Sequence, residues 1–193
     1  MATIGVLALQ GAVREHARVL TSLGADVRLI KRRDDLDGID GVVLPGGEST
    51  TIGMLLEEYE IAPRLRSGEL PIFGTCAGMI LMADEIDGSD QPRLGVMRIG
   101  VRRNAFGRQR ESFEEAIGGA PVAGEPLRGV FIRAPYVTDV GPGVEVLGRV
   151  DGKIVLCRQG QFLAASFHPE LTDDRRLHRY FLEEIVLRAP HLA

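Results

Sequence analysis

The sequence contains little of what marks secreted, membrane-spanning or nucleic-acid-binding proteins. Two cysteines, Cys76 and Cys157, are too few for a disulfide framework. Its 23 basic residues are outnumbered by 27 acidic ones, and the net charge of −4 lacks the basic excess that binds nucleic acid or a membrane surface. No apolar run approaches the roughly 20 residues that span a bilayer, and the first residues lack the basic and apolar regions of a signal peptide. We therefore expect a cytoplasmic protein whose thiols stay reduced.

In the first half of the chain, short apolar segments alternate with segments of helical apolar spacing. The 193 residues, 45% of them hydrophobic, suit one globular domain. Strands are predicted at Thr3–Leu9, Asp26–Ile30, Gly41–Leu44 and Pro71–Phe73, and helices at Val13–Leu23, from Ser49 or Thr50 as the cap to Tyr59, and at Cys76–Ala83. Strands joined through helices predict a parallel sheet that is flanked by helices.

After about Gly95 the pattern changes to strands that are separated by turns rich in glycine and proline. These strands are predicted at Val96–Arg103, Val130–Ile132, Val144–Val150, Ile154–Arg158 and Phe162–Phe167, and an amphipathic helix at Arg175–Leu187. Asp151-Gly152 is typical of a hairpin turn. The simplest account is one α/β domain over residues 1–193, with a central, mostly parallel sheet and an additional antiparallel section in the second half.

The segment around Cys76 is typical of a nucleophile at a tight strand-to-helix turn. Gly74 and Gly78 flank Cys76 two residues away on each side, which relieves crowding where the strand and helix backbones meet. A thiol at a helix N-terminus is favoured as the thiolate, and the N–H of Ala77 could donate to an oxyanion. The alternative is a buried structural cysteine, which is our interpretation of Cys157 in its apolar strand.

A thiolate nucleophile needs a partner that exchanges protons with the leaving group. Of the four histidines, His168 ends an apolar strand in the tripeptide His168-Pro169-Glu170. Proline favours extended backbone before it, and residues two apart in extended chain face the same side, so Glu170 could orient His168. A simple turn without catalysis is the alternative. His16 is predicted on the surface of the first helix, and His178 and His191 lie on or after the last helix with no supporting pattern.

Two further segments are candidates for holding a substrate. Gly46-Gly47 ends a strand, and glycines let a backbone N–H turn into a site; a tight connection without a ligand is the alternative, and the pattern of a phosphate loop is missing. The basic cluster from Arg102 to Arg110 is by default a solvated loop. An arginine there, or Arg133 after its strand, could instead hold a carboxylate with two parallel hydrogen bonds.

Together these segments resemble the class I glutamine amidotransferases, and more closely the glutaminase subunits of pyridoxal 5′-phosphate synthases. The resemblance spans almost the whole chain. It is carried by Gly5–His16, Leu44–Thr51 (LPGGESTT), Phe73–Gly78 (FGTCAG), Arg103-Asn104 with Phe106–Gln109, Phe131–Pro135 (FIRAP) and Gln159–Leu171 (QGQFLAASFHPEL).

The resemblance implies an enzyme that hydrolyses L-glutamine to glutamate and ammonia. It makes Cys76 the nucleophile, His168 the base and Glu170 its orienting acid, with oxyanion donors at Gly47 and Ala77. Glutamine would be held by Gly47, Glu48, Ser49, Arg103, Ile132 and Arg133. The ammonia would pass to a barrel-shaped synthase subunit that makes pyridoxal 5′-phosphate, with Gln10 as a contact to that partner. Neither a cofactor nor a metal is implied.

Two other functions remain possible on the sequence alone. One is an amidotransferase that serves a different synthase, such as the one that makes imidazole glycerol phosphate, although FIRAP and FGRQ favour the vitamin B6 pathway. The other is a non-catalytic member of these folds whose cysteine senses redox state. Such a sensor would lack a matched His-x-Glu pair, so His168 and Glu170 argue against it.

Overall fold

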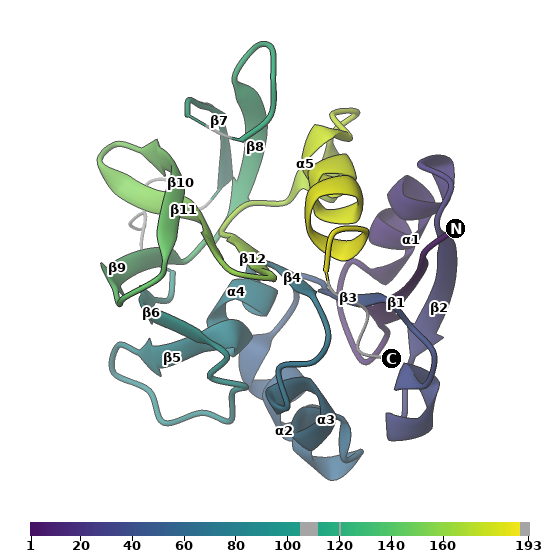
Figure 1. Cartoon of the computed structure of the whole chain (residues 1–193). Coiled ribbons are helices and arrows are strands. Elements are labelled where there is room, and N and C mark those ends of the chain that lie inside the picture. The colour runs from purple at the N-terminus through teal and green to yellow at the C-terminus, as the bar shows by residue number, and fades with distance from the viewer. Residues whose placement is uncertain (105–111, 120, 190–193) are drawn as a thin grey trace.

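The computed structural model describes residues 1–104, 112–119 and 121–189 (Figure 1). The first half alternates strands and helices as predicted. Its elements are β1 (Thr3–Leu7), α1 (Val13–Ser22), β2 (Asp26–Ile30), the 3₁₀-helix η1 (Arg33–Leu36), β3 (Gly41–Leu44), α2 (Ser49–Glu58), α3 (Ile61–Arg66), β4 (Ile72–Thr75), α4 (Ala77–Met82) and β5 (Ala83–Ile86). The second half holds β6 (Met97–Arg102), β7 (Ser112–Ile117), β8 (Leu127–Ile132), β9 (Tyr136–Val140), β10 (Glu145–Val150), β11 (Lys153–Gln159), β12 (Phe162–Ala165), the 3₁₀-helix η2 (Pro169–Leu171), α5 (Arg176–Tyr180) and the π-helical turn η3 (Phe181–Val186).

One large sheet runs through the molecule in the order β2-β1-β3-β4-β12-β11-β9-β6-β5, and β10 pairs with β11. The first five of these strands are parallel to one another. The strands from β12 to β6 pair antiparallel, and β7 with β8 forms a separate antiparallel pair. The predicted α/β fold, with its mostly parallel centre and antiparallel section, is therefore confirmed.

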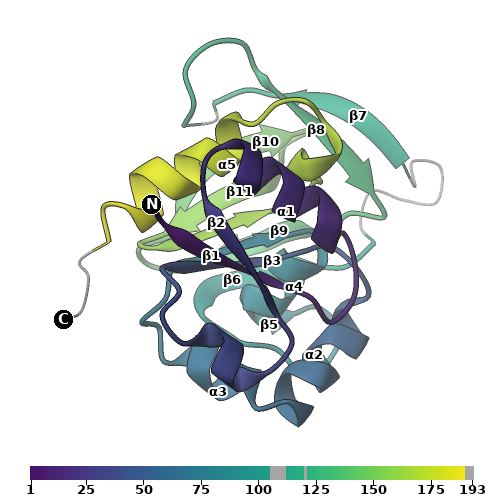
Figure 2. The same ribbon diagram turned by 90° about the vertical axis from the view of Figure 1, so that its right-hand side faces the viewer.

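Helices cover both faces of the parallel part of the sheet. Figure 2 shows α1 and α5 on one face and α2 and α3 on the other. Along β3, Val42 and Leu44 belong to the core beneath α2, α3 and α4, whereas Val43 between them belongs to the core beneath α1 and α5. A strand that is buried on both faces needs apolar residues at every position, which explains the unbroken apolar runs of β1 and β3.

In the second half, the β10–β11 hairpin forms at the turn that the sequence predicts. The hairpin between β10 and β11 turns at Asp151 and Gly152, which have positive φ angles of 49° and 75°. Positive φ at both central residues is what a tight two-residue hairpin turn requires, and it confirms the prediction from Asp-Gly. The short elements α3, β5, β7 and β9 were not predicted. The last helix lies where expected but turns π-helical from Phe181.

The candidate site residues lie just beyond the carboxyl ends of the parallel strands. Gln10 follows β1, Gly46 and Gly47 follow β3, Cys76 follows β4 and His168 follows β12. The strand order reverses between β1 and β3, and ligands of open α/β sheets bind at such a reversal. Among the described residues, no helix is both long and apolar enough to cross a membrane.

Candidate active site

Cys76 lies at a strained turn between β4 and α4. Its backbone has φ 51° and ψ −103°, a conformation that side chains rarely adopt. The flanking glycines make the turn possible: a Cβ on Gly74 would lie 2.6 Å from the Gly78 carbonyl carbon, and a Cβ on Gly78 would lie 2.2 Å from the Leu44 carbonyl oxygen. The predicted crowding of strand and helix backbones is therefore real.

His168 and Glu170 meet as predicted, although by a different backbone geometry. The His168 Nδ1 atom lies 2.7 Å from Glu170 Oε1. The sequence predicted extended chain here, whereas Pro169 begins the one-turn helix η2. Proline fixes its own φ near the helical value, so it starts a turn that folds the carboxylate back onto the imidazole.

Cys76, His168 and Glu170 are all buried. A Cβ built on Gly46 would lie 2.4 Å from His168 Cε1 and 3.3 Å from Cys76 Cβ, so this glycine packs between the imidazole and the thiol. Burial by itself lowers the pKa of His168, but hydrogen bonds to Cys76 and Glu170 outweigh it and raise this pKa to about 10. At neutral pH His168 is therefore an imidazolium that holds a proton beside the sulfur.

The second cysteine has a different environment. Cys157 is wholly buried in β11, where it pairs with Ala164 of β12. Burial raises the pKa of its thiol to about 12. Its interpretation as a structural residue agrees with this environment, because a protonated, inaccessible thiol is a poor nucleophile.

The Gly46–Gly47 loop is tied to the segment that precedes α1. The Gly46 carbonyl accepts from the Ala12 N–H at 3.1 Å, and the Glu48 N–H donates to Gln10 Oε1 at 2.7 Å. Because the C=O and N–H of a trans peptide point in opposite directions, the Gly47 N–H faces away from Ala12. Gln10, expected as a partner contact, thus also holds the loop that carries the expected oxyanion donor.

Glu48 caps helix α2, and the predicted caps Ser49 and Thr50 were wrong. The Glu48 carboxylate accepts from the backbone N–H groups of Thr50 and Thr51 and from the Thr51 hydroxyl. The Thr51 hydroxyl and these amides lower the pKa of Glu48 to about 2. The longer glutamate side chain reaches back over the first turn, a geometry that the usual preference for short capping residues does not indicate.

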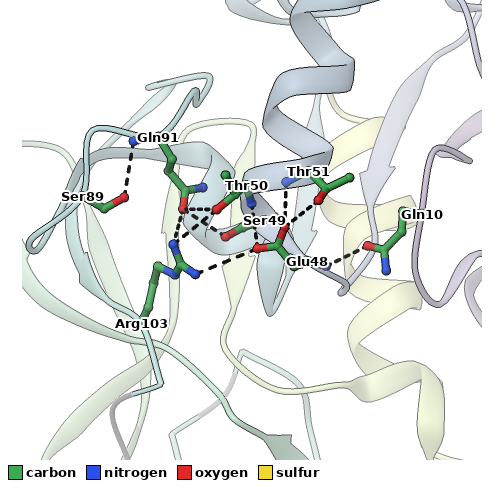
Figure 3. A network of polar contacts seen from close by, with 8 residues as sticks. All are labelled: Gln10, Glu48, Ser49, Thr50, Thr51, Ser89, Gln91 and Arg103. Atoms are coloured by element: carbon green, nitrogen blue, oxygen red, sulfur yellow. Dashed lines mark hydrogen bonds and ion pairs between the residues drawn. The ribbon is translucent and has the colours of Figure 1, made fainter.

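Gln91, a residue that the sequence did not indicate, connects Arg103 to the same helix terminus. Gln91 Oε1 accepts from Arg103 Nη1 at 2.6 Å and from the hydroxyls of Ser49 and Thr50 at 3.2 and 3.3 Å (Figure 3). Arg103 Nη2 lies 3.9 Å from Glu48 Oε1. Gln91 is buried in an irregular loop without periodicity or motif, so only the fold exposes its role.

The remaining expected substrate residues lie at the end of β8. The Ile132 carbonyl lies 3.9 Å from Cys76 Sγ, and Arg133 follows with a positive φ of 43°. Strain of this kind clusters at functional sites. Ala77 is the first residue of α4, so its N–H has no partner within that helix. The residues from Phe106 to Arg110 and His191 lie outside the described part of the chain.

The prediction of His16 as a surface residue was wrong. The His16 side chain is wholly buried beneath α1, with Nδ1 2.9 Å from His178 Nε2 and Nε2 3.0 Å from Thr75 Oγ1. Its position was indicated by helical spacing, because His16 follows Val13 by three residues and precedes Leu20 by four, on the apolar face. The polar partners that make this burial possible come from distant segments, which the helix pattern cannot show.

The comparison with known families agrees with this geometry. Residues 6–187 match the model of the SNO glutamine amidotransferase family. The chain belongs to this family. This chain is similar to two proteins that are both named pyridoxal 5′-phosphate synthase subunit PdxT, one from Pelotomaculum thermopropionicum and one from Geobacillus kaustophilus. They are 59% and 53% identical to it; the matches cover 95% and 94% of this chain and the same shares of the relatives.

Two solved structures have a fold similar to that of this chain. One described as a glutamine amidotransferase is 54% identical, with a TM-score of 0.86 over 93% of this chain and 97% of that one. A structure from Thermoplasma acidophilum, provisionally described as part of a GMP synthase, matches 94% of this chain and 92% of its own. Its TM-score is 0.73 at 18% identity, which is likeness of fold alone. The expected class I amidotransferase architecture and family are therefore confirmed.

Proposed function

We propose that this chain hydrolyses L-glutamine to L-glutamate and ammonia with Cys76, His168 and Glu170 as its catalytic triad, and supplies the ammonia for pyridoxal 5′-phosphate synthesis. The observation that carries the proposal is the meeting of a strained cysteine turn with a buried His168–Glu170 pair 2.7 Å apart. Membership of a glutamine amidotransferase family supports glutamine as the substrate. The name shared by the relatives supports the pathway.

In the first half-reaction the Cys76 thiolate attacks the amide carbon of glutamine. The oxyanion of the tetrahedral intermediate accepts from the N–H groups of Ala77 and Gly47. The C–N bond then breaks as the His168 imidazolium gives its proton to the amide nitrogen, which departs as ammonia and leaves a thioester on Cys76. The raised pKa of His168 supports this step, because the proton is in place before the substrate binds.

In the second half-reaction the neutral His168 takes a proton from water. The resulting hydroxide attacks the thioester carbonyl, and a second oxyanion forms in the same place. Its collapse releases glutamate and restores the thiolate–imidazolium pair. Throughout both steps Glu170 accepts from His168 Nδ1–H, which orients the imidazole and stabilises its charged form.

The charged groups of the substrate have matching groups beside α2. Arg103 offers a planar pair of donors for the α-carboxylate of glutamine, and the Glu48 carboxylate suits the α-ammonium group. Both side chains lie at the same helix terminus, 3.9 Å apart, and Ser49, Ile132 and Arg133 complete the proposed substrate contacts.

A barrel-shaped synthase subunit is the proposed recipient of the ammonia. We place part of the contact at Gln10, which holds the Gly46–Gly47 loop through the Glu48 N–H. Loss of one oxyanion donor typically costs about 10²–10³ in rate. A partner that changes the contacts of Gln10 could therefore switch glutamine hydrolysis on by reorienting one peptide.

The test measures glutamine-dependent ammonia release with and without the synthase subunit, for wild type, Cys76→Ala and Cys157→Ala. We expect Cys76→Ala to abolish release and Cys157→Ala to retain it, since Cys157 lies in the sheet interior. A glutamine-analogue electrophile should label Cys76 and spare Cys157, which separates a glutaminase from a redox-sensing cysteine. Undiminished turnover by Cys76→Ala would refute the assignment of the nucleophile.

A further inference from the structure

A chain of buried polar side chains continues from the triad into the protein interior. Glu170 Oε1 faces His168, and Glu170 Oε2 lies 3.3 Å from His16 Nε2. His16 Nδ1 in turn lies 2.9 Å from His178 Nε2. The side chains of Glu170 and His16 are wholly buried, and so is His178. The chain thus links α1, α5 and η2 to the proposed catalytic carboxylate.

Both interior histidines are neutral. Burial lowers the pKa of His16 well below its usual value, and the neighbouring His178 and His168 lower it further. Burial also lowers the pKa of His178 to about 4. Each ring therefore carries one proton at neutral pH, and the position of that proton decides which way the hydrogen bonds run.

The contacts select one tautomer for each ring. A carboxylate only accepts, so the His16 nitrogen that faces Glu170 Oε2 is stabilised by carrying the proton. His16 Nδ1 is then bare and accepts from His178 Nε2–H. The opposite arrangement would turn a lone pair of His16 towards the carboxylate. It would also leave a proton on His178 Nδ1, which has no hydrogen-bond partner among the described residues.

The surroundings argue against a purely structural explanation. The rings of His16 and His178 lie 6.4 and 5.6 Å from the ring of Phe73, between centroids, in the apolar core beneath α1 and α5. Apolar side chains of similar size would fill this space without a desolvation cost. The polar pair here is held by the hydrogen bond between the two rings and by Thr75, and at one end it lies against the Glu170 carboxylate.

We propose that His16 is a positioning residue of glutamine hydrolysis: its Nε2–H holds Glu170 Oε2, so that Oε1 stays aligned on His168 Nδ1. The hydrogen bond of His16 Nε2 is with Thr75 Oγ1 at 3.0 Å, and its 3.3 Å contact with Glu170 Oε2 is electrostatic, because this oxygen has no hydrogen-bond partner among the described residues. His178 Nε2–H donates to His16 Nδ1 and so keeps the His16 proton on Nε2. The inference rests on the proposed function of Cys76, His168 and Glu170.

The experiment compares two conservative replacements of His16 in the complex with the synthase subunit. His16→Gln places an amide N–H near the position of Nε2, whereas His16→Asn reaches only the position of Nδ1. We expect His16→Gln to keep kcat near wild type and His16→Asn to lose about tenfold to 100-fold, the loss typical when a residue that orients a metal-ligating histidine is replaced. The KM for glutamine should change in neither, because His16 does not contact the proposed substrate residues.

Two further readouts separate positioning from stability. The low-field proton resonance of the His168 Nδ1–H should persist in wild type and His16→Gln and weaken in His16→Asn. His178→Leu should lower kcat less than His16→Asn, because it frees the tautomer of His16 without removing the donor to Glu170. Thermal unfolding of each variant shows whether the measured enzyme is folded. If His16→Asn does not fold, kcat and the His168 Nδ1–H resonance of His178→Leu test the proposal in its place.

Each outcome bears on one proposal. Equal kcat in His16→Gln and His16→Asn, with an unchanged resonance, would overturn the role of His16. So would a loss that follows thermal stability instead of the position of the donor. If wild type releases no ammonia, or Cys76→Ala still releases it, the proposed function itself fails and the His16 variants are not needed to show it.

Discussion

Single residues in this chain carry protonation states that differ from those in water, and His168 is the clearest case. Its imidazole lies between the Cys76 sulfur and the Glu170 carboxylate, and its pKa is raised to about 10. The same side chain free in solution has a pKa near 6.5, so in the folded protein it holds a proton over the whole neutral range.

This shift predicts a pH-dependent stability. A pKa that is higher in the folded state stabilises the fold fully below about 6.5, and the contribution disappears as pH rises from there through about 10. We expect the difference in free energy of unfolding between wild type and His168→Asn to be largest at pH 6 and to shrink steadily towards pH 10. Urea unfolding of both proteins at several pH values measures it.

The comparison of the two proteins provides its own control, because groups that they share cancel in the difference. A difference that stays constant with pH would mean that the folded His168 titrates as it does in water. One that grows towards pH 10 would contradict the sign of the shift.

At the scale of elements, the turn between β4 and α4 is limited by backbone contact. Gly78 approaches the Leu44 carbonyl so closely that a methyl group would lie 2.2 Å from its oxygen. Backbone atoms cannot move aside as a flexible side chain can, so β3 and α4 would have to separate.

Gly78→Ala is therefore expected to lower the free energy of unfolding by about 1–3 kcal/mol and to reduce activity, since α4 carries the expected oxyanion donor Ala77. The matched control is Gly118→Ala, where no atom of the described residues lies within 4 Å of the added methyl group. Thermal unfolding and ammonia release measure both effects. Equal stability of the two variants would show that the contact at Gly78 is not limiting.

The same elements show what could be predicted from the sequence. Apolar periodicity predicted α1 and β3, and Asp151-Gly152 predicted the β10–β11 hairpin, because these signals are local. β7 carries exposed acidic residues at Glu114 and Glu115 and has no alternation, so it is a strand only through its pairing with β8. Pairing between distant strands cannot be predicted from the local pattern of apolar and polar residues.

The candidate site was predictable where it follows a short motif. The turn around Cys76 and the pair His168 and Glu170 each lie within a few consecutive residues. His16 lies 154 positions before Glu170 in the chain, and Gln91 lies 42 positions after Ser49. Only the fold brings such residues together, and the sequence assigned neither of them to the site.

At the scale of the whole molecule, Gln91 joins segments that lie far apart in the chain. Its oxygen accepts from Ser49, Thr50 and Arg103, and so links the start of α2 to the residue that follows β6 (Figure 3). The guanidinium of Arg103 is thereby held towards Glu48, where the α-amino and α-carboxylate groups of glutamine are proposed to bind.

Replacing Gln91 by leucine should raise the KM for glutamine by about tenfold with little change in kcat, since a hydrogen bond to a charged group contributes about 1.5–3 kcal/mol. The reason is that Gln91 positions the expected carboxylate-binding arginine and lies away from the triad. Steady-state kinetics of the synthase complex measures both constants. Ser89→Ala, which removes only a hydrogen bond from the Gln91 N–H, is the control.

A fall in kcat at unchanged KM would contradict this expectation and place Gln91 with the triad. An unchanged KM in Gln91→Leu would mean that Arg103 holds its position without the amide. A rise in KM in Ser89→Ala would instead point to the loop as a whole.

The placement of the candidate site beyond the ends of β1, β3, β4 and β12 also bears on how such a protein diverges. The apolar interior of the sheet and the segments that meet the substrate are separate stretches of chain, so selection can alter one without repacking the other. The Thermoplasma acidophilum structure keeps the fold at 18% identity, which shows how far the scaffold tolerates change. On the proposed function, a new recipient for the ammonia would then require new surface loops on the same apolar core.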